Sequence, residues 1–236
     1  MESLLLHLTL KSDATFGRGD GVAGLVDEEV QHDRYGLPYL SGRTLKGLLA
    51  SECADILFGL KQSMPAALQR WEAAARFLFG AAGSGDDDAA HMRVGDARLP
   101  RDLSLAIAED FRPLENLKRE ERERQWGLKQ TETLEALTAL RRQTALDATG
   151  APLKDTLRTM RVIIRETPFE ARLTFVSDIQ DDGDELALLA ACVKALRRAG
   201  TGRHRGRGRI EAELRALNGQ DITQTHFKRF AQVVNP

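Results

Sequence analysis

The sequence has few of the residues on which several classes of protein depend. Its 236 residues include only two cysteines, Cys53 and Cys192, which are far apart and belong to no cysteine–histidine cluster with the spacing of zinc ligands. We expect both to be reduced, buried thiols of a cytoplasmic protein. No apolar run approaches the roughly 20 residues that cross a bilayer. The opening MESLLLHLTLKS lacks a basic segment and predicts a strand instead of a signal peptide.

Charge is nearly balanced over the chain but unevenly distributed along it. The net charge of −1 argues against a nonspecific nucleic-acid binder. Acidic runs stand at residues 27–29, 86–88 and 181–185, whereas residues 197–209, RRAGTGRHRGRGR, hold six arginines and one histidine. A local basic site of this kind can bind phosphate although the whole chain is almost neutral.

Hydrophobic periodicity predicts alternating strands and helices. Apolar residues alternate in 3–10 and 209–217, as in half-buried strands, and recur at helical spacing in 44–58 and 65–79. Residues 12–42 predict a long loop, of a length that is usually functional or disordered, 80–88 a flexible segment and 91–99 a short strand. Residues 101–143 are charged and helical in character, 161–178 predict a long strand or a pair broken at Pro168, and Asp184 is expected to cap a helix that stops at Gly200. This order predicts an α+β fold with the βαββαβ order of a ferredoxin-like, RRM-like palm.

The segment GTGRHRGRGR favours anion binding. Glycines at 200, 202, 206 and 208 allow positive φ and close approach to a ligand, and the interleaved arginines are bidentate donors for phosphate. The alternative is a solvated basic loop. The segment follows a helix and precedes a strand, the reverse of a dinucleotide-binding loop, and it lacks the Gly-Lys-Ser/Thr ending of a phosphate-binding P-loop.

A second candidate anion site lies in GLPYLSGRTLKG, residues 36–47. Ser41 or Thr44 can cap the following helix, which places free backbone N–H groups, Arg43 and Lys46 at a helix N-terminus. The alternative is an ordinary well-capped helix. Together with the glycine–arginine loop, the segment favours a polyanion over a small ligand.

These motifs, in this order, resemble the RAMP superfamily, which supplies the backbone proteins of CRISPR effector complexes. GLPYLSGRTLKGLL resembles its helix-opening signature, and GTGRHRGRGRI its glycine-rich loop. Three further segments agree: LFG with RVGDARL, ALDATGAPL before a β-hairpin thumb, and RETPFEARLTF. The chain departs from the family at Ser41, where proline is common, at Arg43, where a small hydroxyl residue is common, and in TPFEARL, which lacks a glycine beside its proline. These departures put the subtype in doubt.

Within the family, the chain looks like the repeated backbone subunit of type III complexes, which binds guide RNA and cleaves the paired target RNA with a loop aspartate. The family pattern of aliphatic-Asp-x-x-Val-x-x-Asp followed by Gly-x-Pro-Tyr corresponds to Val26–Asp33 and Gly36–Tyr39, which places the cleaving aspartate at Asp27. A carboxylate there can orient the attacking 2′-hydroxyl or hold Mg²⁺ or another divalent cation, with Glu28 or Glu29 assisting. The alternative is a solvated loop on a non-cleaving relative.

The resemblance implies one domain over 1–236, with a helical insertion at about 60–143 and a thumb at about 146–162. It implies guide RNA, complementary target RNA and neighbouring RAMP subunits as partners. The residues expected to bind RNA are Arg18, Arg43, Thr44, Lys46, Arg203, His204, Arg205, Arg207 and Arg209. Two other functions stay open: a structural guide-binding subunit that does not cut, and a standalone ferredoxin-like metabolic enzyme with a small-molecule pocket.

Overall fold

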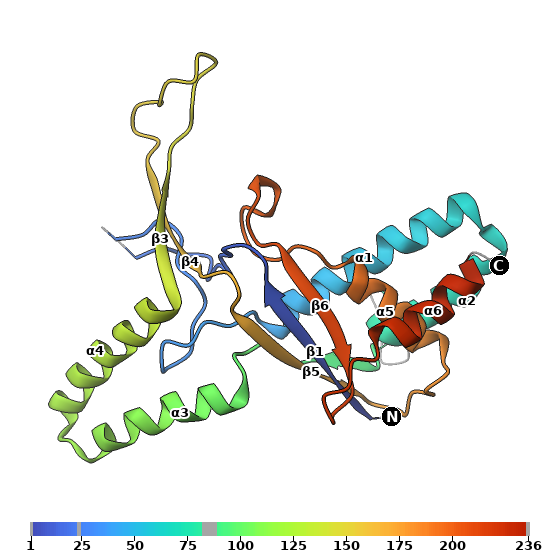
Figure 1. The fold of residues 1–236 in the computed structure, drawn as a ribbon, viewed down its shortest axis with the longest axis horizontal. Coiled ribbons are helices and arrows are strands. Elements are labelled where there is room, and N and C mark those ends of the chain that lie inside the picture. Colours follow the sequence, from blue (N-terminus) through green and yellow to red (C-terminus); the bar gives the residue numbers. More distant parts are fainter. Residues whose placement is uncertain (1, 23–24, 82–88, 235–236) are drawn as a thin grey trace.

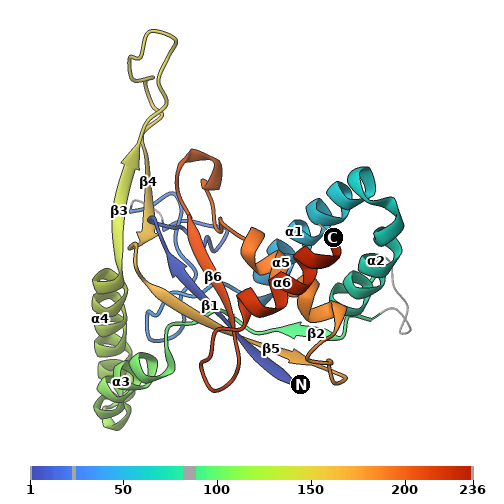
Figure 2. The same cartoon turned by 45° about the vertical axis from the view of Figure 1, so that its right-hand side comes forward.

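The fold is a four-stranded antiparallel sheet with helices gathered on one side. A computed structural model describes residues 2–22, 25–81 and 89–234. The strands β1 (Ser3–Leu10), β2 (Met92–Val94), β5 (Pro168–Phe175) and β6 (Ile210–Arg215) lie in the order β2-β5-β1-β6. Helices α1 (Gly42–Ser63), α2 (Pro65–Phe79), α5 (Asp184–Ala195) and α6 (Thr223–Val234) lie to one side of this sheet (Figures 1 and 2).

The core forms where the apolar faces of the sheet and these helices meet. Leu4, Leu6, Leu8 and Leu10 of β1 are at most 1% exposed, which confirms the alternation seen in the sequence. In α5, every residue from Leu186 to Val193 is buried, as expected for a helix that is apolar on all sides. Trp71 of α2 is fully buried and packs against Phe230 of α6, with ring centroids 4.8 Å apart.

Several element boundaries differ from those expected. α1 extends to Ser63, β2 is only three residues long, and α6 lies in a segment for which no helix was predicted. α5 ends at Ala195, not at Gly200, because residues 197–199 leave the helix and hydrogen-bond with 208–210. Gly183, not Asp184, is its N-cap, and the carboxylate of Asp184 instead pairs with Arg70.

A long β-hairpin projects from the body of the molecule (Figure 1). It consists of β3 (Thr138–Gln143) and β4 (Arg158–Ile163), which pair antiparallel. The segment expected to form a thumb, 146–162, lies within the 138–163 span of this hairpin, and its assignment as the thumb stays a prediction. At the tip, the Asp147 carboxylate accepts hydrogen bonds from the backbone N–H groups of Thr149 and Ala151. The hydroxyl of Thr149 and these amides lower the pKa of Asp147.

Residues 60–143 contain two structurally different parts. In the first, Leu78 of α2 and Met92 of β2 are buried in the common core. In the second, α3 (Arg101–Phe111), a 3₁₀ segment (Arg112–Asn116) and α4 (Arg119–Leu137) form an arm that extends away from the sheet (Figure 1). The limits of the expected insertion stay a prediction, and the acidic run 86–88 lies outside the described residues. Among the helices described, none combines the length and the apolar character needed to cross a membrane.

Candidate nucleic-acid interface

The glycine-rich loop after α5 has the backbone conformation expected for it. Gly200, Gly202, Gly206 and Gly208 have φ of +89°, +70°, +81° and +64°. A Cβ at Gly208 would lie 1.9 Å from the carbonyl oxygen of Ala199, so that only glycine fits there. The loop holds the side chains of Arg203 and Arg205 exposed and that of Arg207 half-buried, whereas the side chain of His204 lies outside the described residues.

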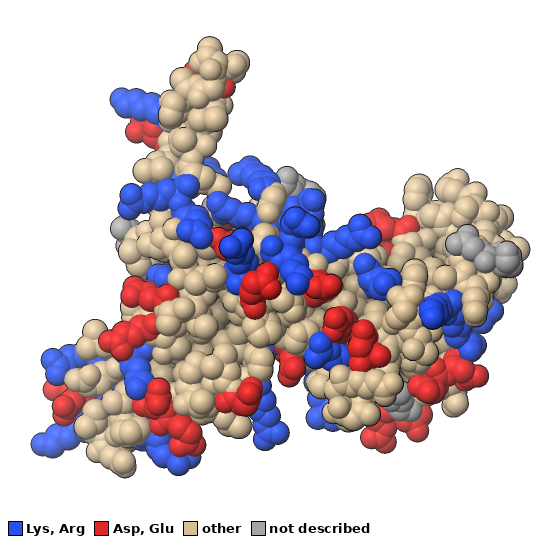
Figure 3. Space-filling model, viewed as in Figure 1, with Lys and Arg blue, Asp and Glu red and all other residues tan. Residues whose placement is uncertain are grey.

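A hollow of about 540 Å³, here called the basic hollow, lies between this loop and the base of the β3–β4 hairpin. Four arginines and one carboxylate face it: Arg158, Arg203, Arg205, Arg207 and Glu28. Gln143 and Met160 of the hairpin complete its wall. Figure 3 shows lysine and arginine side chains gathered around the base of the hairpin.

A second hollow, of about 470 Å³, adjoins the first because Arg207 lines both. Its other cationic residues are Lys11, Arg141 and Arg165. Asp13 organises this wall, since its carboxylate lies 2.8 Å from Nη2 of Arg141 and accepts a hydrogen bond from the backbone N–H of Arg165 at 3.2 Å. The basic surface is therefore wider than the glycine-rich loop alone.

Sequence reasoning missed four of these cations: Lys11, Arg141, Arg158 and Arg165. The segment that contains Arg141 was expected to be helical, and only its pairing with β4 brings it to the hollow. The signal available in the sequence was the density of basic residues on both sides of the expected thumb.

The acidic loop, residues 27–29, runs alongside β4 and makes one parallel bridge with it, between Glu28 and Met160. The backbone N–H of Asp27 donates to the carbonyl of Thr159 at 2.7 Å, and the N–H of Arg161 donates to the carbonyl of Glu28 at 3.0 Å. The side chains of Asp27, Glu28 and Glu29 have three different environments. Asp27 is exposed, and its Oδ2 accepts from the N–H of Thr159 at 2.6 Å. Glu28 points into the basic hollow and accepts from the hydroxyl of Thr201 at 2.9 Å.

Glu29, the third carboxylate, is only 3% exposed and pairs with Arg161, its Oε1 lying 2.9 Å from the guanidinium Nε. Asp27 and Glu28 are therefore the carboxylates of this loop that a cation can reach. In the described ranges 2–22, 25–81 and 89–234, no three His, Cys, Asp or Glu side chains form a group that could hold a metal ion.

The N-terminus of α1 is capped as expected, but part of its expected anion site is already occupied. Ser41 caps the helix as predicted, accepting from the N–H of Thr44 at 3.3 Å. However, the N–H of Gly42 donates to the carboxylate of Asp96 at 3.0 Å, so part of the expected anion site already binds a carboxylate. Lys46 donates to the carbonyl of Met92 at 3.1 Å, and burial lowers its pKa.

The structure thus gathers only some of the predicted RNA-binding residues. Arg203, Arg205 and Arg207 line the basic hollow, whereas Arg43, Thr44 and Lys46 line neither of the two basic hollows. Arg43 and Thr44 are exposed at the start of α1. Arg18 is exposed and pairs with Asp20 at 2.6 Å, and Arg209 is exposed just before β6.

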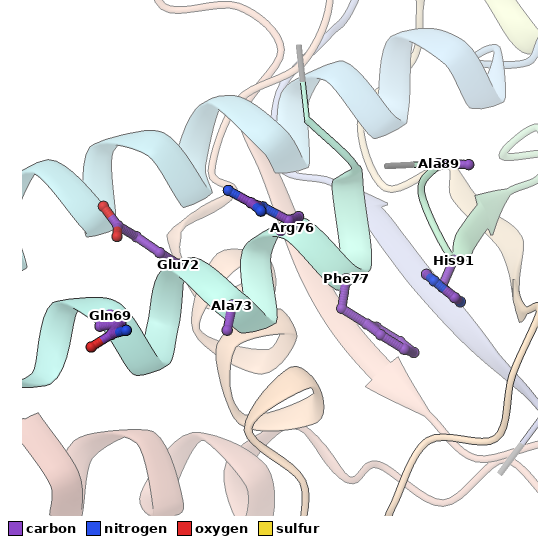
Figure 4. Close-up of a pocket in the computed structure, with 7 residues that line it drawn as sticks. All are labelled: Gln69, Glu72, Ala73, Arg76, Phe77, Ala89 and His91. Carbon is purple, nitrogen blue, oxygen red and sulfur yellow. The ribbon is translucent and has the colours of Figure 1, made fainter. Parts of the chain in front are cut away.

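A third hollow, of about 530 Å³, lies on α2 and contains none of the predicted site residues (Figure 4). Phe77 and His91 stack beside it with ring centroids 4.4 Å apart. Glu72 and Arg76 give it one charge of each sign, so it has no preference for a polyanion.

Comparison with known proteins identifies the family. A sequence model of the RAMP superfamily matches residues 7–211, which is most of the chain. The chain belongs to the RAMP superfamily. The matched region of this RAMP protein runs from β1 to the start of β6 and includes the acidic loop, the hairpin and the glycine-rich loop.

Solved structures share the fold of this RAMP protein. One is a chain from a cryo-EM structure of a type III-B Cmr-β complex bound to cognate target RNA, with a TM-score of 0.59 and 13% identity over 91% of this chain and 97% of that one. Another comes from the Cmr-β apo state, with a TM-score of 0.58 and 14% identity over 92% and 97%. The comparison with curated proteins found no match. At these identities the similarity establishes the mixed α/β, antiparallel fold.

Proposed function

We propose that this RAMP protein is a subunit of a type III CRISPR effector complex, of the III-B kind. In this proposal it binds guide RNA in the basic hollow and cleaves the complementary target RNA beside Asp27. The family membership and the fold shared with Cmr-β chains, one of them from a complex bound to target RNA, support it. It would act in the cytoplasm beside neighbouring RAMP subunits. The sheet order β6-β1-β5-β2 supports a ferredoxin-like palm.

The observation that carries the proposal is the convergence of Arg158, Arg203, Arg205 and Arg207 on one open hollow. Guanidinium groups bind phosphate oxygens with paired, planar hydrogen bonds. Several such groups around the basic hollow suit a chain of phosphates better than a single small anion. The glycines between them have no side chains, which lets an RNA strand approach the backbone closely.

Asp27 is hydrogen-bonded to Thr159 near the start of β4, and the next residue, Glu28, lines the basic hollow. For cleavage, the 2′-hydroxyl of the target must attack the adjacent phosphate in line, which requires a fixed geometry and removal of a proton. The exposed carboxylate of Asp27 can accept a hydrogen bond from that hydroxyl and orient it. Mg²⁺ usually binds one or two carboxylates together with substrate phosphates; held here by Asp27 or Glu28, it would supply neutralisation of the phosphate charge.

A second candidate function is a structural subunit that holds guide RNA without cutting. One observation favours it: Oδ2 of Asp27 already accepts a hydrogen bond from the backbone N–H of Thr159. In a purely structural subunit, that bond would be the reason for an aspartate at this position.

Replacing Arg203, Arg205 and Arg207 together by alanine tests the RNA-binding part. Affinity for a repeat-derived guide RNA should fall, and the slope of log K against log salt should become shallower by about 2, because each phosphate contact to single-stranded RNA contributes roughly 0.7. The measurement is a fluorescence-anisotropy titration at several salt concentrations.

The matched control removes the same charge elsewhere. Arg112, Arg119 and Arg124 are exposed on the α3–α4 arm, and the pairs that two of them form with Glu109 and Glu123 are surface pairs of little energetic value. Their triple alanine variant should retain the wild-type slope. If both triple variants bind like wild type, the basic hollow is not the RNA site.

A further inference from the structure

A buried ion pair joins the acidic loop to the base of the hairpin. Glu29 and Arg161 have side chains only 3% and 5% exposed, and Nε of Arg161 lies 2.9 Å from Oε1 and 3.2 Å from Oε2 of Glu29. A pair this deeply buried loses its hydration and is often no more stabilising than apolar residues of similar size. Stability alone therefore gives a weak reason for its presence.

The pair belongs to a hydrogen-bond chain that reaches three elements. Nη1 of Arg161 in β4 donates to the hydroxyl of Thr138 at 3.2 Å, and that hydroxyl donates to the carbonyl of Leu134 in α4 at 2.5 Å. At the other end, Oε1 of Glu29 accepts from the N–H of Val30 at 2.8 Å. The acidic loop, both strands of the hairpin and the end of the arm are thereby connected through buried polar contacts.

What such a pair can fix is register. The loop and β4 are joined by one bridge, between Glu28 and Met160, and by only a few backbone hydrogen bonds, so backbone pairing alone specifies their register weakly. A slip of one residue would bring Glu29 out of its pocket and break the hydrogen bond between Asp27 and the N–H of Thr159. It would also separate Arg161 from its carboxylate, which leaves a buried charge uncompensated and makes the slipped state unfavourable.

We propose that Glu29 and Arg161 are positioning residues, whose buried pair holds the Asp27 loop in register with β4 so that loop and hairpin meet RNA as one unit. The consequence for cleavage rests on the proposed function. The claim that the pair holds the loop in register with β4 does not rest on it, since that claim concerns only this chain.

Amide hydrogen exchange of the full chain tests whether the pair holds this register, and it requires no activity assay. In Glu29→Gln and in Arg161→Lys, the amides of Asp27, Thr159 and Arg161 should exchange on the order of tenfold faster or more, because the loop detaches locally. Amides in the centre of β1 and β5 should keep wild-type rates. Unchanged exchange at the amides of Asp27, Thr159 and Arg161, or an equal acceleration at every amide, overturns the proposal.

A double variant, Glu29→Met with Arg161→Met, separates positioning from packing. Apolar replacement of both partners should leave thermal stability close to wild type, yet the three amides should still exchange faster, because two methionines do not select one register. If the double variant restores wild-type exchange, the pair acts through packing and the proposal is wrong. Phe230→Leu serves as the control, because it weakens the core where α6 packs against α2, away from the hairpin (Figures 1 and 2).

Single-turnover cleavage at saturating target tests the consequence for RNA. Glu29→Gln should lower the cleavage rate constant by about 100-fold, as misplacement of a catalytic group by 1 Å can do, whereas the affinity for guide RNA stays unchanged. A wild-type rate in Glu29→Gln overturns the inference and leaves the proposed function standing. If the wild-type protein itself does not cut, the proposed cleavage fails, and hydrogen exchange still decides whether the pair sets the register.

Discussion

At the scale of single residues, the consecutive carboxylates Asp27, Glu28 and Glu29 have three different environments. Asp27 is exposed, Glu28 faces four arginines, and Glu29 is buried against Arg161. The same side-chain chemistry therefore serves three purposes, and only exposure and the nearest partner distinguish them. For Glu29, the fixed guanidinium makes the carboxylate a part of the fold instead of a ligand for a cation.

The glycines of the basic loop differ in the same way, which allows a matched prediction. Gly208→Ala should destabilise the protein by about 3 kcal/mol or more, because its Cβ would meet the Ala199 carbonyl at 1.9 Å in addition to the strain of positive φ. Gly206→Ala should cost about 1 kcal/mol, since it has the same sign of φ but nothing within 4 Å of its Cβ. Urea denaturation of both variants measures the difference, and equal costs would contradict the close approach of the two backbone segments.

At the scale of elements, the α3–α4 arm is attached to the loop before α1 by an aromatic cluster. The ring of Trp126 lies 4.8 Å from that of Phe111 and 5.7 Å from that of Tyr35, and the guanidinium of Arg34 lies 4.5 Å from it. The indole N–H also donates to the carbonyl of Arg34 at 2.9 Å. Because α4 has few other buried residues, this cluster should provide most of the attachment of the arm.

Trp126→Ala should therefore weaken the packing of the arm against the loop before α1 by about 2 to 3 kcal/mol of free energy. This is less than for a fully buried tryptophan, and the stability of the sheet should not change. Limited proteolysis should show faster cleavage within residues 101–137, with the remainder of the chain as resistant as in wild type. Leu128→Ala, on the same helix but with a side chain 57% exposed, should change neither. A loss of resistance throughout the chain would show that the arm is part of the common core.

Elements whose signals are local could be predicted from the sequence, whereas long-range pairings could not. The alternation of leucines in β1 and the apolar spacing of α2 identify these elements without a partner. β3 has the sequence TALRRQ, which carries no clear alternation, and it becomes a strand because β4 pairs with it. Likewise, the sequence of 27–29 predicts a single acidic patch. The different environments of its carboxylates depend on β4 residues that lie 132 positions further along the chain.

At the scale of the whole molecule, the near-neutral net charge conceals a separation of charge in space. Three of the six arginines in 197–209, namely Arg203, Arg205 and Arg207, come together with Lys11, Arg141, Arg158 and Arg165 around the base of the hairpin. Such a concentration of one sign attracts a polyanion locally, and salt should weaken that attraction steeply. Elsewhere on the face shown in Figure 3, residues of both signs are mixed.

The measurement that tests the central claim most directly is target cleavage by the protein assembled on a repeat-derived guide. End-labelled complementary RNA is added with Mg²⁺, and wild type is compared with Asp27→Ala and Asp27→Asn. The asparagine variant retains a side-chain oxygen that can accept the hydrogen bond from the N–H of Thr159 but has no negative charge. We predict regularly spaced products from wild type and none from either variant, with guide and target binding retained. Tight binding without cutting by wild type, or unchanged cutting by both variants, would contradict the account.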